Sequence, residues 1–245
     1  MIELNTFSIA ARCERTGMLG VAVSTAVPAV GAICPFIKAG VGAIATQSWV
    51  NPYLGIDGLK LLEAGKSAQE ALDELIDADP GRDDRQLGIV DAKGRAASYT
   101  GASCVQSAGH EIGEGFSVQG NMLVGAATVE HMARAAENSR PLDLPERLML
   151  VLEAGQAAGG DKRGKQSAAL KIFNVEEYPW LDLRVDEHRN PVAELRRILG
   201  VARHQLLPFV GGMPTRKDPL GGLPSEVTEM LMTPPPFRPG GNGGV

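Results

Sequence analysis

The chain has 245 residues, of which 44% are hydrophobic and 22% charged, a composition typical of globular proteins that excludes wholesale disorder. The formal net charge of −5 and the lack of a long basic stretch argue against a nucleic-acid-binding protein. Three widely spaced cysteines and four histidines form no metal-binding motif, so we expect reduced thiols, no metal and no other cofactor. No signal peptide and no apolar run of about 18 residues is present, which predicts a cytoplasmic protein without a membrane partner.

Apolar segments rich in strand formers open the chain and are followed by helical patterns. Strands are predicted over residues 4–11, 18–27 and 41–47, and a helix over residues 52–64. A second helix follows Ser67, which forms a capping box with Glu70. A hairpin over residues 85–91 and 95–100 comes next, and two weaker strands are predicted near 103–110 and 115–120.

The second half of the chain is predicted to contain two further helices, two further strands and a last helix. Helices are predicted over residues 124–138 and 144–158, the second with Asp143 as its N-cap, then strands over 166–174 and 181–185. An amphipathic helix begins at Pro191, and the last dozen residues have the Pro/Gly composition of a disordered tail. We therefore expect one domain over residues 1–200 and a C-terminal extension over 201–245. Pairs of strands and pairs of helices in blocks predict two antiparallel sheets with helices on both outer faces.

Polar side chains gather at the ends of several predicted strands, where loops place binding groups on a rigid scaffold. Thr6 begins the first strand, Ser24 and Thr25 end the second, and Arg12 lies near the turn between them. Residues 46–52 lead from a strand into a helix. Turns and helix caps need the same residue types, and Asn51 before Pro52 is most simply an N-cap.

Residues 159–167 are harder to explain as a turn alone. Glycines, a carboxylate, a guanidinium, an amide and a hydroxyl meet at one strand entrance, with Asp161, Arg163, Gln166 and Ser167 as the candidate binding groups. A guanidinium can hold a carboxylate by two parallel hydrogen bonds, so Arg163 is a candidate substrate clamp. We expect Asp161 and Arg163 to face inward at a pocket mouth and Ser167 to begin a core strand, although a surface turn with an Asp–Arg ion pair is the alternative.

Several of these stretches, in this order, resemble a bacterial and archaeal family known as domain of unknown function 1028. The similar segments are TFSIAAR (6–12), GMLGVAVSTAVPAVGA (17–32), AGVGAIATQSWVNPYLGIDGLKLL (39–62), DPGRDDRQLGIVD (79–91), SVQGNML (117–123), GGDKRGKQSAAL (159–170) and YPWLDLRVDEHRNPVAELRRIL (178–199). The resemblance covers roughly residues 5 to 200. It implies an α+β fold similar to the N-terminal nucleophile (Ntn) hydrolases, a four-layer αββα sandwich.

The resemblance also implies an amidohydrolase that acts on a small amide or acyl-amino compound. Thr6 would be the nucleophile and its own α-amino group the base, because a free amine of pKa about 7.7–8.0 accepts a proton near neutral pH. Thr6 is internal, so this chemistry requires cleavage of the Asn5–Thr6 bond. Gln47, or backbone N–H groups near Ser24, would stabilise the oxyanion, and the side chains of Thr6, Gln47 and Ser24 should lie together. The substrate pocket would be shaped by Arg12, Asn51, Asn121, Asp161, Arg163, Gln166 and Ser167.

Two other functions fit the same sequence. The first is a small-molecule binding protein on a hydrolase-like fold, because a fold does not fix a function. The second is an envelope-associated module, because residues 178–199 resemble the segment that precedes a peptidoglycan-binding appendage in some relatives. A homodimer is also predicted, since helices rich in Ala, Leu and Met such as 144–158 would leave apolar faces for a partner.

Overall fold

The computed structural model describes residues 6–104, 107–125, 127–160 and 164–233. The chain divides into two compact units, the first ending at Arg196 and the second beginning at Arg197, and helix α5 (Pro191–Gln205) contains the boundary. The first unit holds the ten described strands, which form two antiparallel sheets.

The larger sheet has six strands in the order β10-β9-β2-β1-β8-β7. Its strands are β1 (Thr6–Arg12), β2 (Leu19–Thr25), β7 (Gly109–Gly113), β8 (Phe116–Asn121), β9 (Ser167–Phe173) and β10 (Leu181–Val185). In this register Thr6 lies opposite Thr25 on β2 and opposite Asn121 on β8. Strand β1 is therefore central, with its first residue at one end of the sheet.

The smaller sheet has four strands in the order β3-β4-β5-β6 and packs face to face against the larger one. Its strands are β3 (Pro35–Lys38), β4 (Gly42–Ser48), β5 (Arg85–Asp91) and β6 (Ala96–Thr100). The apolar part of the interface joins small side chains from both sheets, among them Ala10, Val23, Ala43, Ala45 and Val90. Small side chains allow the backbones of the two sheets to approach closely. The low aromatic content of 4% is in keeping with this close approach.

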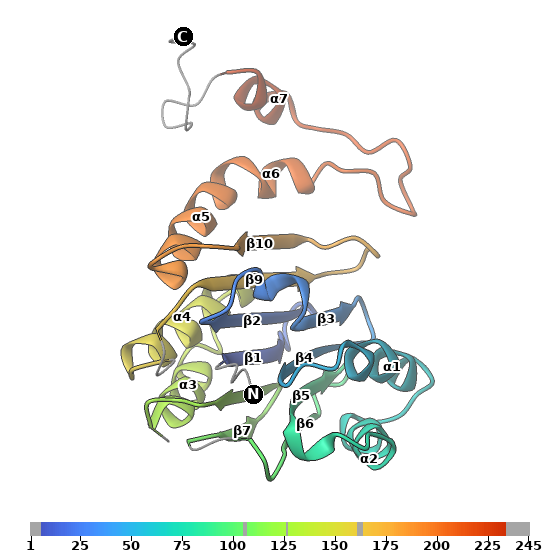
Figure 1. Cartoon of the computed structure of the whole chain (residues 1–245). Coiled ribbons are helices and arrows are strands. Elements are labelled where there is room, and N and C mark those ends of the chain that lie inside the picture. Colours follow the sequence, from blue (N-terminus) through green and yellow to red (C-terminus); the bar gives the residue numbers. More distant parts are fainter. Residues whose placement is uncertain (1–5, 105–106, 126, 161–163, 234–245) are drawn as a thin grey trace. The chain divides into compact units, whose positions relative to one another are not determined.

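Two pairs of helices cover the other faces of the sheets (Figure 1). Helices α1 (Pro52–Glu63) and α2 (Ala68–Ala78) pack on the smaller sheet through residues such as Ile44, Leu87 and Ile89. Helices α3 (Ala127–Asn138) and α4 (Leu144–Ala157) pack on the larger sheet, where a Cβ at Gly155 would meet the ring of Phe7 at 2.9 Å. The predicted α+β class with two antiparallel sheets is confirmed, as are the capping box at Ser67 and the Asp143 N-cap.

Other expectations need correction. Strand β3 was not predicted, because a four-residue strand that begins with proline carries a weak pattern. The strand expected at 103–110 begins only at Gly109, and the helix expected from Val124 begins at Ala127. In the second unit, helices α6 (Leu207–Val210) and α7 (Ser225–Met232) were also missed, and residues 234–245 lie outside the described part of the chain.

The apolar face of α4 is already covered within the chain. Its residues Leu148, Met149, Val151 and Leu152 are fully buried in the single chain. The argument for a homodimer from exposed apolar residues of this helix is therefore wrong. Among the described helices, none has the length and apolar character needed to cross a bilayer.

Candidate functional site

Thr6 lies where strands of both sheets end together. The antiparallel register places the start of β1 beside the ends of β2 and β8, and Gln47 near the end of β4 bonds to Thr6. Residues opposite one another in a sheet project from the same face, so Thr6, Thr25 and Asn121 all face the smaller sheet. The Thr6 side chain is 4% exposed, and its Oγ1 lies 3.1 Å from the Thr25 Oγ1 in a hydroxyl–hydroxyl hydrogen bond.

Gln47 holds the backbone of Thr6 in place. Its Nε2 donates to the Thr6 carbonyl at 3.2 Å and to Gln86 Oε1 at 2.7 Å, while its Oε1 accepts from Ser8 Oγ at 2.5 Å. A glutamine amide has two N–H donors, and both are used here. Gln47 therefore keeps no donor for an oxyanion, which corrects the expectation that it stabilises one. It is a positioning residue for Thr6.

Gln86 is the centre of a buried polar layer between the two sheets. Its Oε1 accepts from Gln47 and from Asn121 Nδ2 at 2.9 Å, and its Nε2 lies 2.9 Å from both the Gly120 carbonyl and Thr100 Oγ1. Ser8 extends the layer by accepting from Gln119 Nε2 at 2.6 Å. Buried amides that satisfy one another in this way fix both sheets in one register.

Asn121 carries an open acceptor next to Thr6. Its residue is 1% exposed, and its Oδ1 has no hydrogen-bond partner among the described residues. Buried polar atoms are nearly always paired, so an open carbonyl oxygen here is suited to an N–H or ammonium group of another species.

The structure separates Ser24 and Arg12 from Thr6. Ser24 lies opposite Phe7, so its side chain projects from the opposite face of the sheet to Thr6, and its hydroxyl donates to the Ser167 carbonyl at 3.3 Å. Arg12 lies at the other end of β1, six residues or roughly 20 Å from Thr6. The expectations that these two residues act beside Thr6 are both wrong, because the register and strand length place them elsewhere.

Three further candidates have local structural partners. Asn51 is the N-cap of α1, accepting from the Tyr53 N–H at 3.1 Å, and it lines a separate surface pocket of about 440 Å³ beside α1 and α2. Gln166 donates to Glu187 at 2.5 Å. Ser167 begins the core strand β9, as expected, and its hydroxyl donates to the Val27 carbonyl at 2.5 Å. Asp161 and Arg163 lie outside the described residues, so their place at a pocket mouth stays a prediction.

Left-handed backbone conformations gather around this end of the sheets. The described non-glycine residues with positive φ are Ala29 (55°), Ser48 (65°), Ser107 (64°) and Met122 (49°). Each lies at or just beyond the Thr6 end of a strand, and Ser48 and Met122 directly follow Gln47 and Asn121. Such conformations cost of order 1–3 kcal/mol each and cluster at functional sites.

A buried ion pair supports the loops beside Ser48. Arg85 Nε donates to Asp79 Oδ2 at 2.9 Å, and its Nη1 donates to the Trp49 carbonyl at 2.7 Å. Burial raises the pKa of the Asp79 carboxyl, but the hydrogen bonds from Arg85 and the Gly81 N–H lower it more, so the net shift is downward. Asp79 and Arg85 thus hold the end of α2 against the loop after β4.

Metal-ligating side chains and thiols are further reactive groups in the described part of the chain. No group of three or more His, Cys, Asp or Glu side chains among the described residues is placed to hold a metal ion. Burial raises the pKa of the Cys34 thiol to about 12, which keeps it protonated at neutral pH.

Ser8, Gln86 and Gln119 were missed by the sequence analysis. A usable signal existed: Ser117, Gln119 and Asn121 alternate along one face of a strand that is otherwise buried, where apolar residues are the rule.

Two facing antiparallel sheets with helices against them, and a buried hydroxyl and amide cluster at one end, make this an α+β protein. The chain belongs to the family of unknown function DUF1028, whose sequence pattern matches residues 6–195. A crystal structure of a DUF1028 protein from Silicibacter pomeroyi is similar, with 28% identity and a TM-score of 0.83 over 90% of this chain and 96% of that one. Anbu (ancestral beta-subunit) from Yersinia bercovieri matches at 13% identity and a TM-score of 0.37, over 85% of this chain and 98% of that one. A search of curated proteins found no match.

Proposed function

We propose that this chain is an Ntn-type amidohydrolase with a four-layer αββα sandwich, and that Thr6 is its nucleophile. The observation that carries the proposal is the buried Thr6 hydroxyl at the start of a central strand, with the open Asn121 Oδ1 on the neighbouring strand. The supporting arrangement is that the described polar groups around Thr6 are uncharged hydroxyls and amides. Such groups suit the amide bond of a small amide or acyl-amino compound.

The reaction requires that the Asn5–Thr6 bond is first hydrolysed. The free α-amino group of Thr6 then accepts the proton of Oγ1 as this oxygen attacks the substrate carbonyl carbon. The ammonium returns the proton to the leaving amine as the C–N bond breaks, which leaves an ester on Thr6. Water then hydrolyses this ester with the same amine as base, releasing the carboxylic acid and restoring Thr6.

Each neighbour has a role in this scheme. The Thr25 hydroxyl orients Oγ1, and Gln47 fixes the Thr6 backbone through its carbonyl. Asn121 Oδ1 accepts from the α-ammonium or from the substrate N–H. Backbone N–H groups are the proposed oxyanion donors, since Gln47 has none to give. Asp161 and Arg163 remain the proposed clamp for a substrate carboxylate.

The test begins with a chain whose first residue is Thr6, released from a cleavable tag, beside the uncut chain. Amine release is measured on a panel of acyl anilides and N-acyl amino acids, and intact mass is recorded for protein purified from its native source. The proposal expects turnover only with a free Thr6, loss in T6A, and retention in T6S. The T16A variant serves as the matched control, because it removes an exposed threonine hydroxyl in the turn at the other end of β1 and leaves the nucleophile and its neighbours. Activity of the uncut chain, or of T6A, would overturn the role of Thr6.

A binding protein without turnover is the second candidate. It is favoured by the hydrogen bonding of the Thr6 side chain, which in the described residues is to a hydroxyl and not to a base. Amino-acid and amide ligands would then raise the melting temperature of the uncut chain without being consumed. An envelope-associated role remains a third proposal, for which retention on cell-wall sacculi is the test.

A further inference from the structure

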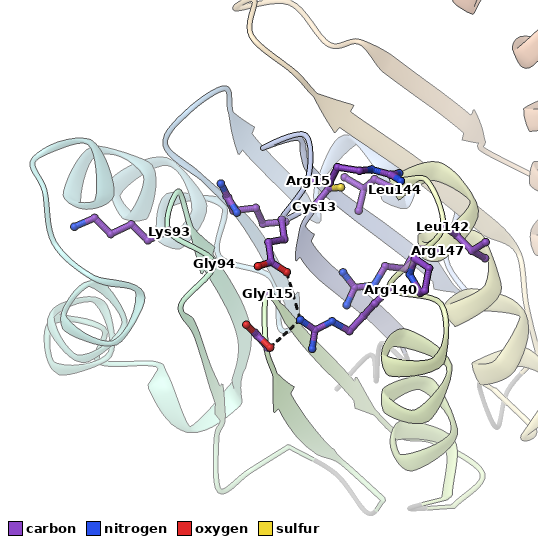
Figure 2. Close-up of a pocket in the computed structure, with 13 residues that line it drawn as sticks. Cys13, Arg15, Lys93, Gly94, Gly115, Arg140, Leu142, Leu144 and Arg147 are labelled. Atoms are coloured by element: carbon purple, nitrogen blue, oxygen red, sulfur yellow. Dashed lines mark hydrogen bonds and ion pairs between the residues drawn. The ribbon is translucent and has the colours of Figure 1, made fainter.

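A cavity of about 480 Å³ lies at the end of the sheets opposite Thr6. Its walls come from the end of β1 and the turn after it, the β5–β6 and β7–β8 turns, and the α3–α4 connection with the start of α4 (Figure 2). Five cationic side chains line it: Arg12, Arg15, Lys93, Arg140 and Arg147. Only two carboxylates, Glu14 and Glu114, line it as well, which leaves a net charge of +3 in a chain whose net charge is −5.

Arg147 forms the inner part of this wall. It is 5% exposed, its Nε donates to the Ala136 carbonyl at 3.0 Å, and its guanidinium lies over the Phe116 ring at 5.5 Å. Its Nη2 is buried and has no hydrogen-bond partner among the described residues. Burial, and then the nearby charge of Arg140, lowers the pKa of Arg147 by more than the nearby Glu137 carboxylate raises it. An unpaired buried charge is costly, so a missing counter-ion is the natural explanation.

Arg140, in contrast to Arg147, already has its counter-ions. It pairs with Glu114 at 2.7 Å and with Glu14 and Glu137 at 3.6 Å each, so its charge is already balanced. Figure 2 shows Arg140 and Arg147 lying close together, with the dashed contacts made by Arg140 alone.

Arg12, like Arg15 and Lys93, has no carboxylate partner among the described residues. It is half-buried, and Gly17 and Gly94 flank its side chain, since a Cβ at either position would come within 3.9 Å of it. Both glycines have a positive φ, which residues other than glycine rarely adopt, so the two turns beside Arg12 need these residues.

We propose that this cavity is a binding site for a small oxyanion, a phosphate or a carboxylate, held by the Arg147 and Arg12 guanidinium groups. Planar guanidinium groups bind both kinds of oxyanion by paired N–H···O bonds. The anion completes the hydrogen bonding of Arg147 Nη2. The site is separate from Thr6 and does not depend on the proposed hydrolysis.

The test uses the full chain, titrated calorimetrically with sodium phosphate, pyrophosphate or succinate, each against sodium chloride of equal ionic strength. R147M and R12Q remove the two guanidinium groups. R134Q is the matched control, because Arg134 is exposed on α3, pairs with Glu130 and does not line the cavity. Melting temperatures without ligand identify any variant that fails to fold, and R12Q keeps the test valid if R147M does.

We expect at least one oxyanion to bind, with affinity about tenfold or more weaker in R147M and in R12Q and unchanged in R134Q and T6A. Binding of phosphate or pyrophosphate alone would identify a phosphate ligand, and binding of succinate alone a carboxylate. The proposal is overturned if none binds beyond chloride, if binding survives both cavity variants, or if R134Q weakens it equally.

Discussion

Replacing Gln86 with leucine tests the buried polar layer that positions Thr6. Leucine has a similar size, so the change removes hydrogen bonds without opening a large cavity. Gln86 Oε1 is the acceptor for one N–H of Gln47 and for one N–H of Asn121, at 2.7 and 2.9 Å. Both amides are about 1% exposed, so water does not replace the lost acceptor.

The magnitude follows from these two orphaned donors. A buried donor left without a partner costs about 1–3 kcal/mol, so Q86L should lower the free energy of unfolding by about 4 kcal/mol. For a chain of this size each kcal/mol corresponds to roughly 2–4 °C, which gives a fall in melting temperature of roughly 8–16 °C.

Urea unfolding followed by circular dichroism, together with calorimetry, measures this loss. The matched control is Q69L, because Gln69 lies on the exposed surface of α2 and its amide donates to the exposed Asp73. The loss of stability in Q69L should stay within about 0.5 kcal/mol. A loss below about 1 kcal/mol in Q86L would refute the reasoning. It would mean that Gln47 is not held by Gln86 and so does not fix Thr6.

Two further substitutions test the packing and the ion pair around this layer. G88A should cost about 1–3 kcal/mol in unfolding free energy, because the new Cβ would collide with the amide of Gln119, which two hydrogen bonds lock in place. D79N should cost about 3 kcal/mol at pH 7, because it leaves Arg85 buried without its anion. Since the pKa of Asp79 is lowered on folding, its stabilisation is complete above about pH 4 and disappears as pH falls through the folded value, so D79N and wild type should converge in acid. Chemical unfolding across pH 2–7 checks both. The matched controls are G109A, where a new Cβ would meet no atom within 4 Å, and D73N, at an exposed carboxylate.

Local patterns in the sequence predicted most of the elements. Ser67 with Glu70, and Asp143 before Pro145, mark helix starts by hydrogen bonds within four residues, and both were read correctly. Strand β10 was predicted with its observed bounds. Its sequence LDLRV alternates apolar and polar residues, and the structure buries the apolar ones. Elements whose pattern depends only on neighbouring residues can therefore be predicted from a single sequence.

Which residues come together around Thr6 could not be predicted in the same way. The resemblance implied that Ser24 lies beside Thr6 and that Arg12 shapes the substrate pocket, yet register and strand length separate both residues from Thr6. Asn121 comes beside Thr6 through the pairing of β8 with β1, and Gln86 reaches this end only through the packing of one sheet on the other. A single sequence encodes neither arrangement locally. Which face a residue takes depends on register, and a shift of one residue reverses it.

Ser48 offers a direct test of whether backbone strain at the Thr6 end serves function. Its φ of 65° is unfavourable for any residue with a Cβ, and it follows Gln47, the residue that fixes the Thr6 carbonyl. S48G should therefore raise the unfolding free energy by about 1 kcal/mol, less a few tenths from greater chain entropy in the unfolded state. S48A keeps the Cβ and loses only the weak contact from the Cys104 thiol at 3.5 Å, so it should change stability by less than about 0.5 kcal/mol. If strain holds Gln47 in position, S48G will be more stable but will release amine more slowly from the panel of amides when Thr6 is the first residue, while S48A matches wild type. Equal stability of S48G and S48A would show that the loop relaxes freely, and the strain would then have no part in positioning Thr6.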